Sequence, residues 1–164
     1  MTQPIFSEAD YLYMSEALNL AKKAMALDEI PVGALIVRGD EVLGRGLNMP
    51  LTSKDPTHHA EIAAIRDASK NAHNYRLPGT ILYVTLEPCT MCFGALIHAR
   101  IEQIIYAAQE PRAGVIESRL KLPEALFYNH RIAVKGGLLE NESRELLQSF
   151  FQKRRGLVSR DGCL

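Results

Sequence analysis

The sequence has no net charge to suggest a partner, because 19 lysines and arginines balance 19 aspartates and glutamates over 164 residues. The overall charge therefore gives no support to nucleic-acid binding, and any basic surface has to be local. One local basic segment is present at residues 152–160, which contain Lys153, Arg154, Arg155 and Arg160 and no acidic residue.

Cysteine is scarce and long apolar runs are absent. Two of the three cysteines are only three positions apart, which is not the framework of a small disulfide-rich protein. No apolar run approaches the ~20 residues of a membrane span, so we expect no membrane partner. Residues 1–6 lack the basic and apolar regions of a secretory signal. These absences predict a reducing, cytoplasmic setting.

The composition and the order of the predicted elements indicate one globular α/β domain over residues 1–164. Hydrophobic residues make up 47% and charged residues 23%, enough for a sizeable core and too little charge for disorder. Ser7 and Asp10 resemble a capping box, and apolar residues then recur every three or four positions to about Leu27. Patterning and turn residues predict helices over 7–27, 59–71, 88–99 and 140–155, strands over 33–37, 42–47, 80–85, 103–108 and 131–135, a loop over 48–57, and a partly helical connection over 111–128.

Two short motifs carry the chemistry of the sequence, His59-Ala60-Glu61 and Pro88-Cys89-Thr90-Met91-Cys92. Cysteines at positions i and i+3 lie on neighbouring faces of one helical turn, so both sulfurs can reach one ion. The start of a helix favours the thiolate, which is the species that binds metal. His59 adds a nitrogen ligand at the start of the earlier predicted helix. Three protein ligands and one open position are typical of catalytic zinc.

Glu61 is the residue that would convert a metal site into a reaction centre. Positions i and i+2 within a helix point roughly 200° apart, so His59 and Glu61 converge only if His59 lies at the helix cap or in its first turn. A carboxylate beside the ion can accept a proton from a bound water whose pKa zinc lowers to about 7. The same group can then pass that proton to a ring nitrogen and to a leaving amine.

Other interpretations of these motifs stay open at this point. A lone Cys-x-x-Cys is also typical of redox or structural-zinc sites, but a thioredoxin-like role leaves His59 and Glu61 unexplained. A zinc module without enzymatic activity would need a fourth protein ligand. His58 has the wrong spacing to Glu61 and is interpreted as a loop residue. The remaining candidates are interpreted as structural or incidental: His73, His98, His130, Phe150 and Cys163.

On these residues the chain resembles the cytidine-deaminase superfamily and, within it, the bacterial tRNA-specific adenosine deaminases. Besides the two motifs, segments 28–34, 55–61, 86–101, 129–131 and 149–155 carry the resemblance. It implies a three-layer α/β/α fold with a mixed five-stranded sheet, a homodimer, one Zn²⁺ per chain, and a basic terminal helix over about 140–156.

The resemblance also assigns roles to individual residues. It implies that His59, Cys89 and Cys92 bind zinc and that Glu61 is the catalytic proton shuttle. The substrate-binding residues that it implies are Asn48, Ala60, Glu110, Phe151 and Arg154. One departure is visible: where the family usually has an aspartate after the strand that ends near Ala107, this chain has Gln109-Glu110, and the glutamate is one methylene longer.

The function implied by the resemblance is zinc-dependent hydrolysis of adenosine to inosine at the wobble position of a tRNA anticodon, with an arginine tRNA as the expected partner. An anticodon loop is single-stranded, so its base can enter a pocket without opening a duplex. The alternative is deamination of a free base or nucleotide, such as guanine or cytosine, on the same scaffold. The basic terminal helix favours RNA, because an enzyme for small molecules has no need of it.

Overall fold

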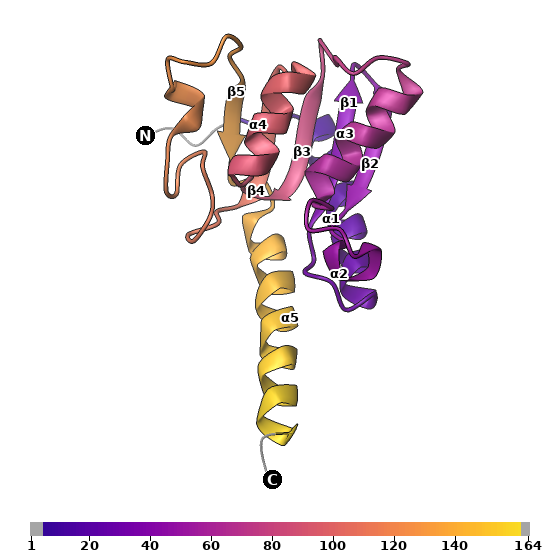
Figure 1. The fold of residues 1–164 in the computed structure, drawn as a ribbon, viewed down its shortest axis with the longest axis vertical. Coiled ribbons are helices and arrows are strands. Elements are labelled where there is room, and N and C mark those ends of the chain that lie inside the picture. Colours follow the sequence, from indigo (N-terminus) through magenta and orange to yellow (C-terminus); the bar gives the residue numbers. More distant parts are fainter. Residues whose placement is uncertain (1–4, 162–164) are drawn as a thin grey trace.

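The structure is a computed structural model that describes the backbone of residues 5–161 and the side chains of residues 5–156. The side chain of Arg160 and the whole of Cys163 lie outside the described residues. Figure 1 shows a sheet with helices on both of its faces, and a last helix that extends well beyond the sheet. No helix in the described part of the chain is long and apolar enough to cross a membrane.

The sheet has five strands in the order β2-β1-β3-β4-β5. β1 is antiparallel to both of its neighbours, whereas β3, β4 and β5 run parallel. The sheet is therefore mixed, as predicted. The strands are β1 (Gly33–Arg38), β2 (Glu41–Leu47), β3 (Ile81–Leu86), β4 (Gln103–Ala108) and β5 (Ala133–Gly136).

Two hydrophobic clusters separate the three layers, because successive strand residues point to opposite faces of the sheet. In β1, Leu35 packs toward helix α1 (Glu8–Ala26) and the neighbouring Ile36 packs toward helices α3 (Ala60–Asn71) and α4 (Thr90–Ala99). Helix α5 (Glu140–Asp161) contacts α1, β3 and β4. The predicted three-layer α/β/α fold is confirmed.

The structure corrects several predicted boundaries. Residues 48–57, predicted as a loop, contain the short helix α2 (Pro50–Ser53), which begins at a proline as helices often do. Pro88 precedes α4 and does not lie in its first turn, because Cys89 is the N-cap. The terminal helix continues to Asp161. Only Leu122–Glu124 of the 111–128 connection is helical, as a single 3₁₀ turn.

Two glycines of β2 allow α3 to lie unusually close to the sheet. A Cβ atom at Gly46 would lie 2.0 Å from the backbone oxygen of Ala60, and one at Gly44 would lie 2.4 Å from that of Ala64. Any side chain at these positions would push the helix away. Glycine at these two positions therefore sets the height of the first turn of α3 above the sheet.

The N-terminus of α1 is tied to the sheet through Asp10. Its carboxylate accepts hydrogen bonds from the Ser7 backbone N–H at 2.8 Å and from the Tyr83 hydroxyl at 2.7 Å. Ser7 Oγ in turn accepts from the Asp10 N–H, which completes the predicted capping box. Burial acts to raise the pKa of Asp10, but the hydrogen bonds from Ser7 and Tyr83 outweigh it and hold that pKa below its usual value.

We expect Asp10→Asn to lower the free energy of unfolding by about 1–3 kcal/mol at pH 7, because a buried charged acceptor is lost. Since the folded-state pKa lies below the unfolded value of about 3.9, the contribution of Asp10 is fully present above that pH. It is lost as the pH falls through the folded-state pKa. Urea unfolding of both proteins between pH 3 and pH 7 measures this.

The matched control is Asp40→Asn, the same substitution at an exposed residue between β1 and β2, where little stability depends on the carboxylate. Its cost should therefore be nearly the same at both ends of the pH range. A cost of Asp10→Asn that does not shrink toward pH 3 would contradict the assignment.

Candidate metal centre and active site

The candidate site lies at one edge of the sheet, where several segments distant in sequence end together. β2, β3 and β4 all finish at this edge, and the antiparallel β1 begins there. The residues that follow these strands therefore meet. They are Asn48 after β2, Glu87 to Cys89 after β3, and Gln109 and Glu110 after β4.

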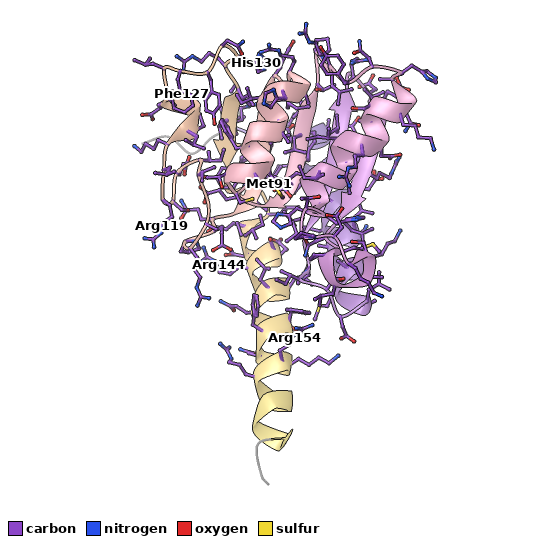
Figure 2. All side chains as sticks on the ribbon, viewed as in Figure 1. Met91, Arg119, Phe127, His130, Arg144 and Arg154 are labelled. Carbon is purple, nitrogen blue, oxygen red and sulfur yellow. The ribbon has the colours of Figure 1, made fainter. Side chains whose placement is uncertain are left out.

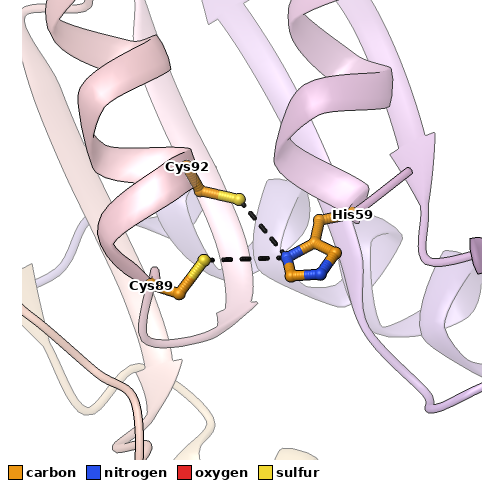
Figure 3. A group of neighbouring side chains, drawn as sticks. All are labelled: His59, Cys89 and Cys92. Atoms are coloured by element: carbon orange, nitrogen blue, oxygen red, sulfur yellow. Dashed lines mark hydrogen bonds between the residues drawn. The ribbon is translucent and has the colours of Figure 1, made fainter. Parts of the chain in front are cut away.

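Helices α3 and α4 both begin at this edge, and each begins with a predicted metal ligand. His59 is the N-cap of α3 and Cys89 is the N-cap of α4, and neither side chain caps its own helix. The prediction that His59 lies at the helix cap is confirmed. Figure 3 shows the side chains of Cys89 and Cys92 pointing across the gap between the helices toward the His59 ring.

The distances within this group suit a tetrahedral zinc ion. His59 Nδ1 lies 3.7 Å from Cys89 Sγ and 3.5 Å from Cys92 Sγ, and all three atoms lie within 4.8 Å of one another. Zinc bonds of about 2.3 Å to sulfur and about 2.0–2.1 Å to nitrogen, at tetrahedral angles, separate those two atoms by about 3.6 Å. The residues thus fit the ion, and no other such group of His, Cys, Asp or Glu occurs among the described residues.

The two thiols are electrostatically coupled. A hydrogen bond from Cys92, supported by His59, lowers the pKa of the Cys89 thiol to about 4. The same bond to Cys89 raises the pKa of Cys92. The contact between the two thiols thus favours a thiolate at Cys89, and the helix N-termini that converge here act in the same direction.

Glu61 lies in the first turn of α3, buried with only 4% of its surface exposed. Burial raises the pKa of Glu61 to about 7, and the charge of Cys89 acts in the same direction. A carboxyl group with a pKa near neutrality can both accept and release a proton, which is the property that general acid–base catalysis needs.

A cavity of about 230 Å³ opens beside Glu61. Its volume lies below the range of about 300–1,000 Å³ typical of pockets for drug-sized ligands, so it suits one planar base better than a whole nucleotide. Asn48, Glu110 and Phe151 all lie on its wall. The Asn48 side chain is held by a hydrogen bond from its Nδ2 to the Ile30 carbonyl at 3.2 Å. Apolar side chains complete the wall: Ile30, Val32, Pro50, Leu86, Ala113 and Leu147.

A wider groove of about 740 Å³ continues outward from this cavity and shares Leu86, Glu110, Leu147 and Phe151 with it. Four arginines line the groove: Arg112, Arg144, Arg154 and Arg155. Figure 2 marks Arg144 near the start of α5 and Arg154 further along the same helix. The site is thus acidic at its floor and basic outside, an arrangement suited to a ligand with a neutral base and a charged backbone.

Two of the expected substrate-binding residues lie differently from the others. The Ala60 side chain is fully buried in the core beneath the cavity, so the group that this residue can offer is its backbone N–H in the first helical turn. Arg154 donates to the Asp28 carbonyl at 2.8 Å and lies 5.1 Å from the Phe150 ring centroid. A guanidinium has five N–H donors, so this bond leaves donors for a phosphate.

The aromatic pair in α5 and the remaining histidines are placed as follows. Phe150 is buried and packs with its neighbour, while Phe151 is 43% exposed at the cavity mouth. His130 Nε2 lies 2.7 Å from the Ile101 carbonyl, in agreement with a structural role. His58 belongs to the loop before α3, and His73 and His98 are exposed away from the cavity.

Sequence reasoning missed three residues at this site: Glu87, Arg112 and Arg144. Glu87 is buried at the cavity wall and accepts hydrogen bonds from residues 110–118. Burial alone would raise its pKa, but the hydrogen bonds led by the Glu117 N–H lower it. The only feature of the sequence that pointed to Glu87 is its position directly before the Pro88-Cys89 motif. The two arginines reach the groove from segments that only folding brings together.

Known proteins resemble this chain both in sequence and in fold. The cytidine and deoxycytidylate deaminase zinc-binding region matches residues 7–108. The tRNA-specific adenosine deaminase of Haemophilus influenzae is 47% identical over 150 residues, covering 91% of this chain and 87% of that protein. The enzyme of the same name from Bacillus subtilis is 39% identical over 146 residues, covering 89% and 91%.

Among solved structures, one from work on A-to-I editing by tRNA:A34 deaminases at the wobble position has a TM-score of 0.80 and 43% identity, covering 83% of this chain and 99% of that one. A guanine deaminase from Bacillus subtilis has a TM-score of 0.59 and 39% identity, covering 63% and 66%. The fold and the site together define a zinc-binding deaminase. The chain belongs to the cytidine and deoxycytidylate deaminase family and, within it, to the tRNA-specific adenosine deaminases.

We expect Cys92→Ser to lower the zinc content of the purified protein sharply, because a hydroxyl is a poorer zinc ligand than a thiolate. The melting temperature should fall with it, since metal binding is coupled to folding. Elemental analysis and thermal unfolding measure the two effects. The control is Met91→Leu, a change at an exposed residue of α4 that lies between the two cysteines and is not one of the three grouped residues. It should retain zinc, and equal zinc in both variants would contradict the ligand assignment.

Proposed function

We propose that this protein hydrolyses adenosine to inosine at the wobble position of a tRNA anticodon. The observation that carries the proposal is the junction of three features: a metal-binding triad, a buried carboxyl beside it, and a small cavity that opens into a groove lined by arginines. The relatives named tRNA-specific adenosine deaminase support the same substrate.

His59, Cys89 and Cys92 would hold one Zn²⁺ per chain. Bound zinc supplies a Lewis acid that lowers the pKa of a coordinated water to about 7. Glu61 accepts a proton from the water that adds to C6 of the base, and donates it to the adjacent ring nitrogen. The Glu61 carboxylate then takes the proton of the new C6 hydroxyl and delivers it to the amine. The C6–N bond breaks as the C6 carbonyl forms, and adenosine and water become inosine and ammonia.

Binding would be divided between the cavity and the groove. In the cavity, the Asn48 amide would offer a hydrogen bond to the base, and Phe151 would offer a ring at the mouth. The Ala60 backbone N–H, in the first turn of α3, would offer a second hydrogen bond. In the groove, Glu110 would contact a ribose of the RNA. Arg154 and the three other arginines would contact its phosphates. Single-stranded RNA is recognised in this way, by splayed bases and charge contacts.

The proposal has four further parts that rest on the family resemblance. The whole chain, residues 1–164, acts as one deaminase domain. The partner is the anticodon stem-loop of an arginine tRNA, which is bound as RNA through the basic helix at about 140–156. The active form is a homodimer, and it works in the cytoplasm.

The competing function is deamination of a free base. The similarity to a guanine deaminase supports this alternative. The arginine-lined groove separates the two functions, because a free base carries no phosphates for the arginines to bind.

We expect the zinc-loaded protein to release ammonia from an anticodon stem-loop with adenosine at the wobble position, and not from free guanine. Glu61→Gln should keep its zinc and its fold but lose at least about 10²–10⁴-fold in turnover, because the amide cannot accept the proton. An ammonia assay, with zinc analysis of both proteins, measures this.

The control substrate is the same stem-loop with guanosine at the wobble position. If free guanine is deaminated rapidly and the stem-loop is not, the proposal of a tRNA substrate is wrong, but the assignment as a deaminase still holds. Turnover by metal-replete Glu61→Gln at the wild-type rate would remove the proton shuttle.

We expect binding of the stem-loop to weaken as salt rises, because phosphate contacts release counterions. Arg154→Gln combined with Arg155→Gln should reduce the slope of log K against log salt by about 1.4, at about 0.7 per phosphate for single strands. The matched control is Lys23→Gln with Lys70→Gln, two exposed cations outside the groove. Equal slopes for the two double variants would count against the groove as the RNA site.

A further inference from the structure

The Glu87 carboxylate is a buried acceptor at the centre of a tight loop. Only 2% of its surface is exposed. Residues 110–118, here named the rim loop, wrap around it. Four backbone N–H groups of the rim loop donate to this carboxylate: Glu110 at 2.9 Å, Ile116 at 2.9 Å, Glu117 at 2.8 Å and Ser118 at 3.0 Å. The Ser118 hydroxyl donates to it as well.

The fit between Glu87 and the rim loop leaves no room for change. A Cβ atom at Gly114 would lie 2.4 Å from both Cδ and Oε2 of Glu87 and 2.7 Å from the backbone oxygen of Glu110, so a larger residue there would displace the carboxylate or the loop backbone. The Gly114 N–H donates to the Glu110 carbonyl at 2.9 Å and closes a turn around the carboxylate. The Val115 N–H donates to the Pro88 carbonyl at 3.1 Å, which ties the loop to the start of α4.

The rim loop forms part of the wall of both the cavity and the groove. Glu110 and Ala113 line the cavity, and Glu110, Pro111 and Arg112 line the groove. The Arg112 backbone N–H donates to Glu110 Oε1 at 2.8 Å, so this turn orients the Glu110 side chain and places Arg112 beside it. Apart from the one 3₁₀ turn after it, the described connection between β4 and β5 has no helix or strand that could hold the rim loop in place. Burial of Val115 and Ile116 and the Val115–Pro88 bond hold its middle, and the hydrogen bonds to Glu87 hold both of its ends.

We infer that Glu87 is a positioning residue for RNA binding, which acts by holding the rim loop so that Arg112 and Glu110 face the groove. This inference rests on the proposed function for its substrate, but not for the loop conformation. Glu87 lies beside Pro88 and the metal-binding motif, so one short segment both presents Cys89 and fixes the opposite wall of the groove.

The chemistry of the contact requires a carboxylate. An ionised carboxylate is acceptor-only, and all five of its partners donate. Glutamine has the same length but replaces one oxygen with an NH₂ group, which would face the Glu110 N–H and the Ser118 hydroxyl. The single N–H bond on that side, from Glu110, is lost, while the three at Oε1 can remain.

The test compares zinc-loaded wild type with Glu87→Gln over the full chain. Amide hydrogen exchange should speed up by roughly 10- to 100-fold within the rim loop, since a charge-assisted bond to a buried acceptor is lost, and stay unchanged in α1, α3 and the sheet. With the anticodon stem-loop, KM should rise roughly tenfold and kcat should change by less than about twofold, the pattern of lost uniform binding.

Two further variants make the result specific. Glu124→Gln removes one exposed carboxylate from the same connection and should match wild type in exchange and in KM. Ser118→Ala removes only the hydroxyl donor and should change both readouts in the same direction as Glu87→Gln, but less. It also replaces Glu87→Gln as the test if that variant does not fold.

The outcomes are separable from the proposed function. If the wild-type protein does not deaminate the stem-loop, the proposed function is wrong. Hydrogen exchange then still tests whether Glu87 holds the rim loop in place. A rim loop that stays protected, or an unchanged KM, overturns the inference. Faster exchange throughout the chain, or zinc loss, in the variants also overturns it, because Glu87 would then have only a general structural role.

Discussion

The close contact between α3 and β2 is the constraint on which the site depends. Gly44 and Gly46 bring the helix backbone onto the sheet at a distance that no side chain would allow. The first turn of α3 is thereby fixed above the end of β2, with His59 at its cap and Glu61 buried just inside. The short segment after β3 brings α4 to the same place. Two helix N-termini then converge, and their dipoles favour the negative charge of thiolates.

That geometry also explains how two ordinary motifs become a site. N-cap positions usually hold serine, threonine, aspartate or asparagine, because those side chains satisfy free N–H groups of the first turn. His59 and Cys89 occupy these positions without capping their helices. Their side chains are therefore available to each other. The same extended backbone at the cap lets His59 and Glu61, two positions apart, approach one point.

Charge is arranged in layers that match the two tasks of the site. Glu61, Glu87 and the coupled thiols lie at the closed end, where burial makes each protonation state sensitive to its neighbours. The arginines lie in the open groove, on the outer side of the buried acidic groups. Glu110 and Phe151 line both parts of the site and join them.

Local pattern was sufficient wherever one segment decides its own structure. Spacing and helix geometry account for the Ser7 and Asp10 cap, the alternation of helices and strands, the neighbouring cysteines at i and i+3, and the cap position of His59. The sequence alone could not show that Glu87 receives the rim loop, that Arg112 and Arg144 share a groove, or that the Ala60 side chain points into the core. Those facts depend on which strands are neighbours and on where their ends meet, and contacts between segments tens of residues apart are decided only when the sheet forms.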